Sequence, residues 1–227
     1  MTKIPQKKDI DESIEFIKNN PTIREVLITG GDALLLHNTR LEYIFKKLSN
    51  IDHVEILRVG TRTLATLPFR IDEELALLLR KYRVNISTQF NHAGEITPEA
   101  VKAIDMLVDN GILVRNQMVL LHNINDDKYC IQKTNEELQK YRVIPYYLFH
   151  PKDVKSTLHF QVDISKGLEI MKHLEGRTSG MCKPTYVYNS PLGLGKVPLV
   201  PMENIEYDEN GYKFTTWENK TVKRPDR

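Results

Sequence analysis

The chain has 227 residues, of which 41% are hydrophobic and 27% charged, a composition typical of a globular protein. Its 32 basic and 30 acidic residues leave a net charge of +2 without a basic stripe, which argues against a nucleic-acid partner. No apolar run is long enough for a membrane span, and the first residues lack the apolar core of a signal peptide. We therefore expect a cytoplasmic protein that does not contact a membrane.

Two cysteines, Cys130 and Cys182, lie far apart in the sequence and form no Cys-x-x-Cys pair. This spacing excludes a disulfide framework and argues against a cysteine-ligated zinc or iron–sulfur site within this chain. We expect both to be small buried residues, and we predict no metal ligands.

Helical and strand-like segments alternate along the first three quarters of the chain. Periodicity and capping residues predict helices at residues 9–18, 40–48, 72–82, 97–110, 128–141 and 165–174. Apolar runs predict strands at residues 25–29, 54–59, 84–90, 113–121 and 143–149. The ends of one helix are marked by Thr97 as N-cap, Pro98 at the first helical position and Gly111 as the C-terminal stop. This order predicts an α/β fold with parallel strands, a partial (β/α) barrel.

The tail departs from this rhythm. Apolar and polar residues alternate at 185–188 and again at 212–217, which predicts antiparallel strands, with a turn at 208–211. We therefore predict two parts, a partial barrel over residues 1–176 and an antiparallel C-terminal extension over residues 177–227.

Polar residues follow five successive predicted strands, where the chemistry of a β/α barrel is found. These segments are Thr29–Asp32, Gly60–Thr63, Gln89–His92, Asn116–Gln117 and His150–Asp153. Any one of them can simply satisfy its own backbone. Five at matching positions predict a site at this end of the strands.

One lysine, Lys196, lies in a glycine- and proline-rich turn. Gly193 and Gly195 allow positive φ and close approach to a ligand, and Pro191 and Pro198 bracket the turn. A lysine presented in this way can form a Schiff base with pyridoxal phosphate, although an ordinary solvated lysine remains the alternative. A P-loop does not fit, because Lys196 is followed by valine rather than Ser or Thr.

Six segments resemble the radical SAM 2,3-aminomutase family over nearly the whole chain. They read EVLITGGDAL from residue 25, RVGTRT from 58, TQFNH from 88, RNQ from 115, PYY from 145 and GLGKVP from 193. The resemblance implies a radical SAM-type barrel that moves an amino group between C2 and C3 of an amino acid. It also implies S-adenosylmethionine, a [4Fe-4S] cluster and pyridoxal phosphate as cofactors.

The resemblance also implies roles for individual residues. Lys196 matches the lysine that carries pyridoxal phosphate and would be catalytic. The nucleotide-binding positions matched in this sequence are Thr29, Gly30, Gly31, Asp32, His92 and Gln117.

Two further positions, Lys152 and Asn189, match those that read the substrate side chain. The lysine-using branch carries aspartates there, whereas a cationic amine with a neutral amide suits a carboxylate. The pattern therefore resembles the glutamate branch, which interconverts L-glutamate and β-glutamate. A lysine 2,3-aminomutase, and a surface pairing of Lys152 with Asp153, stay open as alternatives.

The family's Cys-x-x-x-Cys-x-x-Cys cluster motif does not occur in these 227 residues. The resemblance therefore implies a C-terminal fragment, inactive alone, whose cysteines come from an upstream segment or a partner chain. The sequence leaves open whether the chain is a truncated form, a split gene product or a subunit, and whether it forms a homo-oligomer. A non-catalytic nucleotide- or phosphate-binding barrel is the competing hypothesis, and an acid–base isomerase ranks last because no carboxylate pair marks the strand ends.

Overall fold

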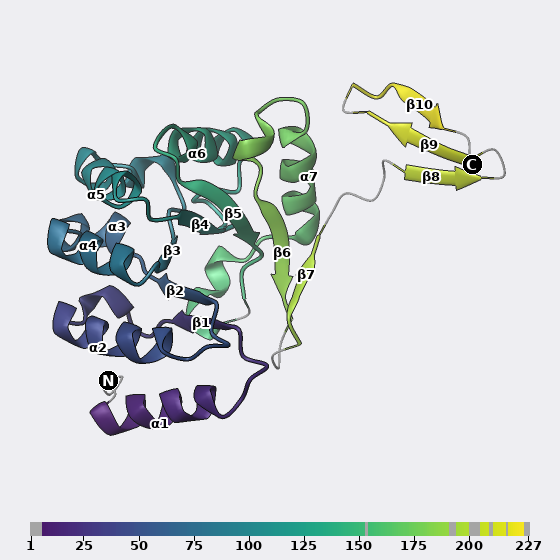
Figure 1. Cartoon of the computed structure of the whole chain (residues 1–227). Helices are drawn as coiled ribbons and strands as arrows, with labels where there is room; N and C mark the ends of the chain where they lie inside the picture. Colours follow the sequence, from purple (N-terminus) through teal and green to yellow (C-terminus); the bar gives the residue numbers. More distant parts are fainter. Residues whose placement is uncertain are drawn as a thin grey trace. The chain divides into compact units, whose positions relative to one another are not determined.

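The computed structural model describes residues 6–152, 154–190, 194–199, 205–208, 211–216 and 218–224 (Figure 1). Seven strands form one sheet in the order β1-β2-β3-β4-β5-β6-β7, and three more form a separate antiparallel sheet in the order β10-β9-β8. Among the described residues, no helix is long and apolar enough to cross a bilayer.

Strands and crossover helices follow each other in chain order. The strands are β1 (Glu25–Ile28), β2 (Ile56–Gly60), β3 (Asn85–Thr88), β4 (Val114–Val119), β5 (Ile144–Phe149), β6 (Thr185–Asn189), β7 (Lys196–Pro198), β8 (Ile205–Asp208), β9 (Gly211–Thr215) and β10 (Thr221–Arg224). The α-helices are α1 (Lys7–Lys18), α2 (Asn38–Ser49), α3 (Thr63–Thr66), α4 (Glu73–Lys81), α5 (Pro98–Asp109), α6 (Lys128–Lys140) and α7 (Ile164–Leu174). Short 3₁₀ turns lie at Ala33–Leu35, Pro68–Arg70, Ala93–Glu95, Lys155–Phe160 and Gly180–Cys182.

The chain divides into two compact units, the first comprising Met1–Phe90, Gly94–Asn116 and Tyr141–Val143. In this unit β1, β2 and β3 pair in parallel, and α2, α4 and α5 lie side by side along them (Figure 1). Strand alternation sends Leu57, Val59 and Ile86 toward these helices, where all three are buried. The opposite face of β2 carries Arg58, which pairs with Glu25 at 2.6 Å.

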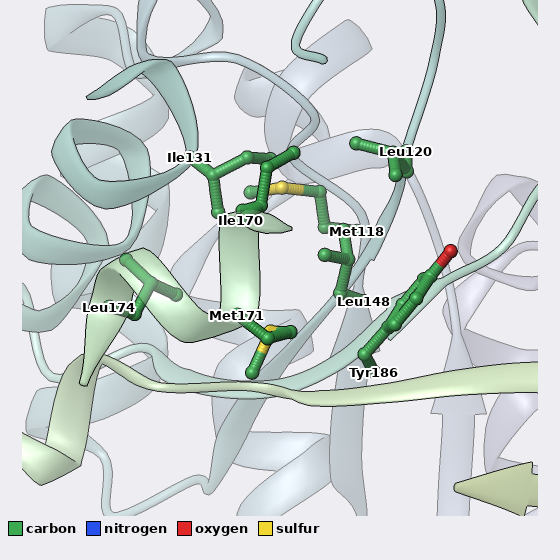
Figure 2. Packing of buried hydrophobic residues seen from close by; sticks show 8 residues of the cluster. All are labelled: Met118, Leu120, Ile131, Leu148, Ile170, Met171, Leu174 and Tyr186. Carbon is green, nitrogen blue, oxygen red and sulfur yellow. The ribbon is translucent and has the colours of Figure 1, made fainter. Parts of the chain in front are cut away.

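The second unit comprises Asn91–Ala93, Gln117–Lys140 and Ile144–Arg227. Its core lies between the strands and α6 and α7 (Figure 2). Its fully or almost fully buried members are Met118, Leu120, Ile131, Leu148, Ile170, Met171, Leu174 and Tyr186. Because side chains alternate along a strand, the neighbours of these core residues on β4, β5 and β6 point to the opposite face of the sheet.

Several local predictions are confirmed. The Thr97 side chain accepts a hydrogen bond from the Ala100 amide at the start of α5, and Gly111 takes φ +75° just beyond its end. The hairpin of β8 and β9 turns between Asp208 and Gly211 as expected.

The expectation of antiparallel pairing from residue 185 holds for the edge of β6 that meets β7 and is wrong for its other edge. This strand pairs in parallel with β5, as a sixth parallel strand after the crossover helix α7, and antiparallel pairing begins only with β7. Alternation alone could not distinguish these arrangements, because it reports which face is buried and not the direction of the partner strand.

Candidate functional site

Asp32 ties together two strand-end loops of the first unit. Its carboxylate accepts hydrogen bonds from the Leu34 amide (3.1 Å), the Thr61 hydroxyl (2.6 Å) and the Arg62 amide (2.6 Å). The Arg62 guanidinium in turn donates to Glu95, in the loop after β3, at 2.8 Å. Polar residues after β1, β2 and β3 thus form one hydrogen-bonded group, although its member after β3, Glu95, lies outside the predicted segment Gln89–His92.

Because its carboxylate accepts these three hydrogen bonds, the Asp32 side chain connects the loop after β1 to the loop after β2. Gly30 and Gly31 are exposed, and nothing lies within 4 Å of the position that a Cβ would take at either residue. A Cβ at Gly60 would lie 3.5 Å from the Thr29 hydroxyl oxygen, so that hydroxyl stands beside the end of β2. The groups open to a ligand are therefore the Thr29 hydroxyl and the backbone of the two glycines.

The asparagines after β3 and in β4 serve the backbone. The Asn116 side chain accepts a hydrogen bond from the Phe90 amide at 2.7 Å and donates one to the Phe90 carbonyl at 3.0 Å. Asn91 accepts from the Val119 amide at 3.0 Å, and Asn125 donates to the Asn91 carbonyl at 2.8 Å. For these residues the structural alternative is the right one.

Two predicted nucleotide-binding residues, His92 and Gln117, belong to the second unit. His92 is exposed directly after Asn91. Gln117 is half-buried on β4. Its neighbour Met118 points into the core formed with α6 and α7, so Gln117 points to the opposite face of the sheet. Neither assignment to the nucleotide is tested by these positions.

The β6–β7 hairpin brings Asn189 and Lys196 together. They are directly opposed in the antiparallel ladder, which places their Cβ atoms about 4.5–5.5 Å apart on one face. Gly195 takes φ +93°, and its carbonyl accepts from the Ser190 amide at 2.9 Å. The predicted positive φ is thus confirmed at Gly195, whereas Gly193 and Pro191 lie outside the described residues.

Aromatic residues of β5 lie on the same face as this pair. Tyr147 pairs with Thr185 of β6. Thr185 and Asn189 are four residues apart on this strand and therefore lie on one face, which the Tyr147 ring shares. The Lys196 ammonium lies 5.6 Å from the centroid of the Tyr147 ring, within the range of a cation–π contact. Phe149 follows on the same face, with its ring centroid 5.4 Å from that of Tyr147.

Lys152 lies in the loop after β5, and its side chain is exposed. Its carbonyl accepts hydrogen bonds from the Gln161 side chain and the Val154 amide, both at 2.8 Å. The alternative partner Asp153 lies outside the described residues. Lys152, Asn189 and Lys196 all belong to the second unit: Lys152 lies in the loop after β5, Asn189 at the end of β6 and Lys196 at the start of β7.

Sequence reasoning missed Tyr147 as a neighbour of Lys196, and Thr61 and Arg62 as the partners of Asp32. The only sequence signal for the first was the tyrosine pair at 146–147 at the start of an otherwise apolar strand. Within the described part of the chain, no group of three His, Cys, Asp or Glu side chains could hold a metal ion.

The fold is that of a partial radical SAM-type β/α barrel with an antiparallel extension. Native anSMEcpe with bound AdoMet has a similar fold, with a TM-score of 0.58 over 76% of this chain and 51% of that one. The two sequences are 13% identical, so this likeness concerns the fold alone. No family model matches the chain.

The sequence relatives are 2,3-aminomutases. Glutamate 2,3-aminomutase of Clostridioides difficile is 48% identical over 221 residues, which are 97% of this chain and 52% of that protein. L-lysine 2,3-aminomutase of Acetoanaerobium sticklandii is 44% identical over 204 residues, 89% of this chain and 49% of that protein. L-lysine 2,3-aminomutase of Bacillus subtilis is 43% identical over 196 residues, 86% and 42% of the two chains.

The chain is thus a homologue of the 2,3-aminomutases along most of its length, and it spans about half the length of these curated relatives. Relatives named for glutamate and for lysine match it at similar identity, so overall similarity does not identify the substrate.

Proposed function

We propose that this chain provides the substrate- and pyridoxal-binding part of a radical SAM 2,3-aminomutase that interconverts L-glutamate and β-glutamate. The observation that carries the proposal is the cross-strand pair of Asn189 and Lys196 beside the Tyr147 ring. It combines a covalent-cofactor lysine, an amide that can read a side chain and a flat aromatic surface on one face of the sheet.

The residues around Lys196 fit pyridoxal phosphate. Lys196 is exposed, the space beside Gly195 is open, and the Tyr147 ring lies beside the Lys196 amine. When bound, this cofactor supplies an electron sink next to the amino group that migrates. Lys196 would hold it through Nζ, and Tyr147 would position that amine; the residues that contact its phosphate are not assigned.

The first unit fits the methionine part of S-adenosylmethionine. In this proposal the Thr29 hydroxyl and the backbone of Gly30 and Gly31 contact the ligand, and Asp32 holds them in place through its three donors. For His92 and Gln117, in the second unit, nucleotide binding stays a proposal that rests on the family resemblance alone. This chain does not fit the [4Fe-4S] cluster, because its only cysteines are Cys130 and Cys182. An upstream segment or a partner chain would supply the cluster ligands.

Charge is the argument for glutamate. Lys152 and Asn189 offer an ammonium and an amide where the lysine-using branch carries aspartates. Lys152 would attract the side-chain carboxylate of glutamate, and it would repel the terminal ammonium of lysine. Lys152 is exposed in this chain, and we expect the contact to be shielded from water in the complete enzyme, where a charge-assisted contact discriminates by roughly 2–4 kcal/mol.

Covalent labelling tests the cofactor lysine. The chain is incubated with pyridoxal phosphate and reduced with borohydride, and the modified peptide is mapped. We expect the label on Lys196 and its loss in Lys196→Ala, with Lys223→Ala as a matched control on an exposed strand lysine of β10. Labelling spread evenly over surface lysines, or unchanged by Lys196→Ala, contradicts the assignment.

Reversing the net charge at Lys152 and Asn189 tests whether the substrate is glutamate or lysine. With the cluster-bearing part supplied, Lys152→Asp combined with Asn189→Asp should shift kcat/KM from glutamate toward lysine, because two acceptors replace an ammonium and an amide. A parent that prefers lysine, or a ratio that changes less than threefold, refutes the reading of these two residues. The assignment of Lys196 does not depend on that result.

The second candidate is a non-catalytic nucleotide- or phosphate-binding module. The exposed backbone at Gly30 and Gly31 supports it equally well. It predicts nucleotide binding without labelling of Lys196, so the same borohydride experiment separates the two.

A further inference from the structure

Gly167 lies inside helix α7, where a glycine destabilises the helix by about 1 kcal/mol relative to alanine. Its presence there therefore needs a structural explanation. A Cβ at this position of α7 would lie 2.2 Å from Cζ and 2.3 Å from the hydroxyl oxygen of Tyr186. The phenol head therefore lies directly against the helix backbone. Tyr186 is 1% exposed, so its hydroxyl needs a partner inside the protein. Figure 2 shows its ring among the buried side chains of the core.

That partner is His150. Its Nδ1 lies 2.8 Å from the Tyr186 hydroxyl, and the imidazole is itself 9% exposed. The His150 amide also donates to the Val187 carbonyl of β6 at 2.8 Å. One residue beyond the end of β5 is thus joined to β6 through both its backbone and its side chain.

This junction lies two residues before Lys152. Beyond it the loop is held again, by the two hydrogen bonds that the Lys152 carbonyl accepts from Gln161 and Val154. On the other side, Val187 lies two residues before Asn189, which faces Lys196. The strand that fixes His150, β6, is therefore the strand that carries Asn189, whose cross-strand partner on β7 is Lys196.

We propose that the His150–Tyr186 hydrogen bond, which Gly167 makes room for, is a positioning device that holds Lys152 in register with Asn189 and Lys196. The side-chain reading by Lys152 rests on the proposed function, whereas the fixing of the loop does not. Burial holds the pKa of Tyr186 at about 12, so the phenol stays protonated and able to donate. These residues do not contact the reacting atoms in this proposal; they act through Lys152.

Amide hydrogen exchange on the full chain tests the fixed loop. Tyr186→Phe removes the hydroxyl and keeps the ring, leaving a buried imidazole nitrogen without this partner. We expect exchange at His150 and Val154 to accelerate about tenfold or more, with α6 unchanged. Tyr188→Phe is the matched control, since it removes a hydroxyl from the same face of β6 and keeps the ring contact with His150 at 5.9 Å.

Gly167→Ala provides a second route to the same loss, because the added methyl group must displace the phenol. If it unfolds the chain, Tyr186→Phe still decides. Exchange that stays within twofold of the parent at His150 and Val154 in Tyr186→Phe overturns the proposal. So does a uniform acceleration across α6 and the loop, which would show general destabilisation instead of local positioning.

Amine footprinting separates this proposal from the proposed substrate. Excess glutamate should slow acylation of Lys152 in the parent and in Tyr188→Phe, and this protection should fall at least threefold in Tyr186→Phe. Protection that persists in Tyr186→Phe overturns positioning through Lys152. No protection in the parent refutes the glutamate reading, and the exchange rates then judge the fixed loop alone.

Discussion

Replacing Asp32 tests whether this carboxylate stabilises the strand-end loops or instead binds a ligand directly. Asp32→Ala removes the acceptor for the Leu34 amide, the Thr61 hydroxyl and the Arg62 amide. Hydrogen bonds to a charged group contribute about 1.5–3 kcal/mol each, so three give an upper range of about 4.5–9 kcal/mol.

The expected loss is smaller than this sum. Thr61 can turn its hydroxyl toward Thr63, whose own hydroxyl oxygen lies 2.8 Å away, and water can reach the half-buried Asp32 site. We therefore expect the free energy of unfolding to fall by about 3 kcal/mol. Asp32→Asn should lose about half as much, because its amide keeps one acceptor oxygen and sets an N–H group against the Arg62 amide.

Urea unfolding of the parent, both variants and Asp105→Ala measures these differences without any ligand. Asp105 is an exposed aspartate on α5 and should change stability by no more than about 0.5 kcal/mol. An Asp32→Ala variant as stable as Asp105→Ala would refute the structural role. Asp32 would then return to the set of residues that contact the nucleotide directly.

Three further predictions concern the second unit and the metal. Gly195→Ala places a side chain at φ +93°, so reductive pyridoxal labelling of Lys196 should slow about fivefold, while Leu194→Ala labels like the parent. Burial raises the pKa of Tyr186 to about 12, above the ordinary value of 10 that the unfolded chain keeps, so this contribution to stability is complete below pH 10. It should then decline by about 1.4 kcal/mol per pH unit up to about pH 12 in denaturant titrations, and Tyr186→Phe should lack this decline. Anaerobic reconstitution of the chain alone with iron and sulfide should give no [4Fe-4S] absorption or EPR signal, because it has two cysteines; 5′-deoxyadenosine formation by the chain alone would contradict this.

The sequence by itself was enough for the alternation of helices and strands and for the ends of α5. These features depend on interactions within a few residues, such as the capping of Ala100 by Thr97. The resemblance to the 2,3-aminomutases was also visible in short motifs, and the sequence relatives confirm it. Sequence also marked Gly195 as a position for positive φ, since the motif is local.

Tertiary structure decided the hydrogen-bond partners of the polar residues. Asp32, Asn91 and Asn116 each accept hydrogen bonds from partners far away in the sequence, which no local pattern predicts: Thr61, Val119 and Phe90 lie 26 to 29 residues away. The pairing of Asn189 with Lys196, the Tyr147 ring beside Lys196 and the fit of Tyr186 against Gly167 depend likewise on strand register and helix packing. Hydrophobic patterning reports which face of an element is buried, but not which neighbour it meets, so contacts of this kind follow only from the folded chain.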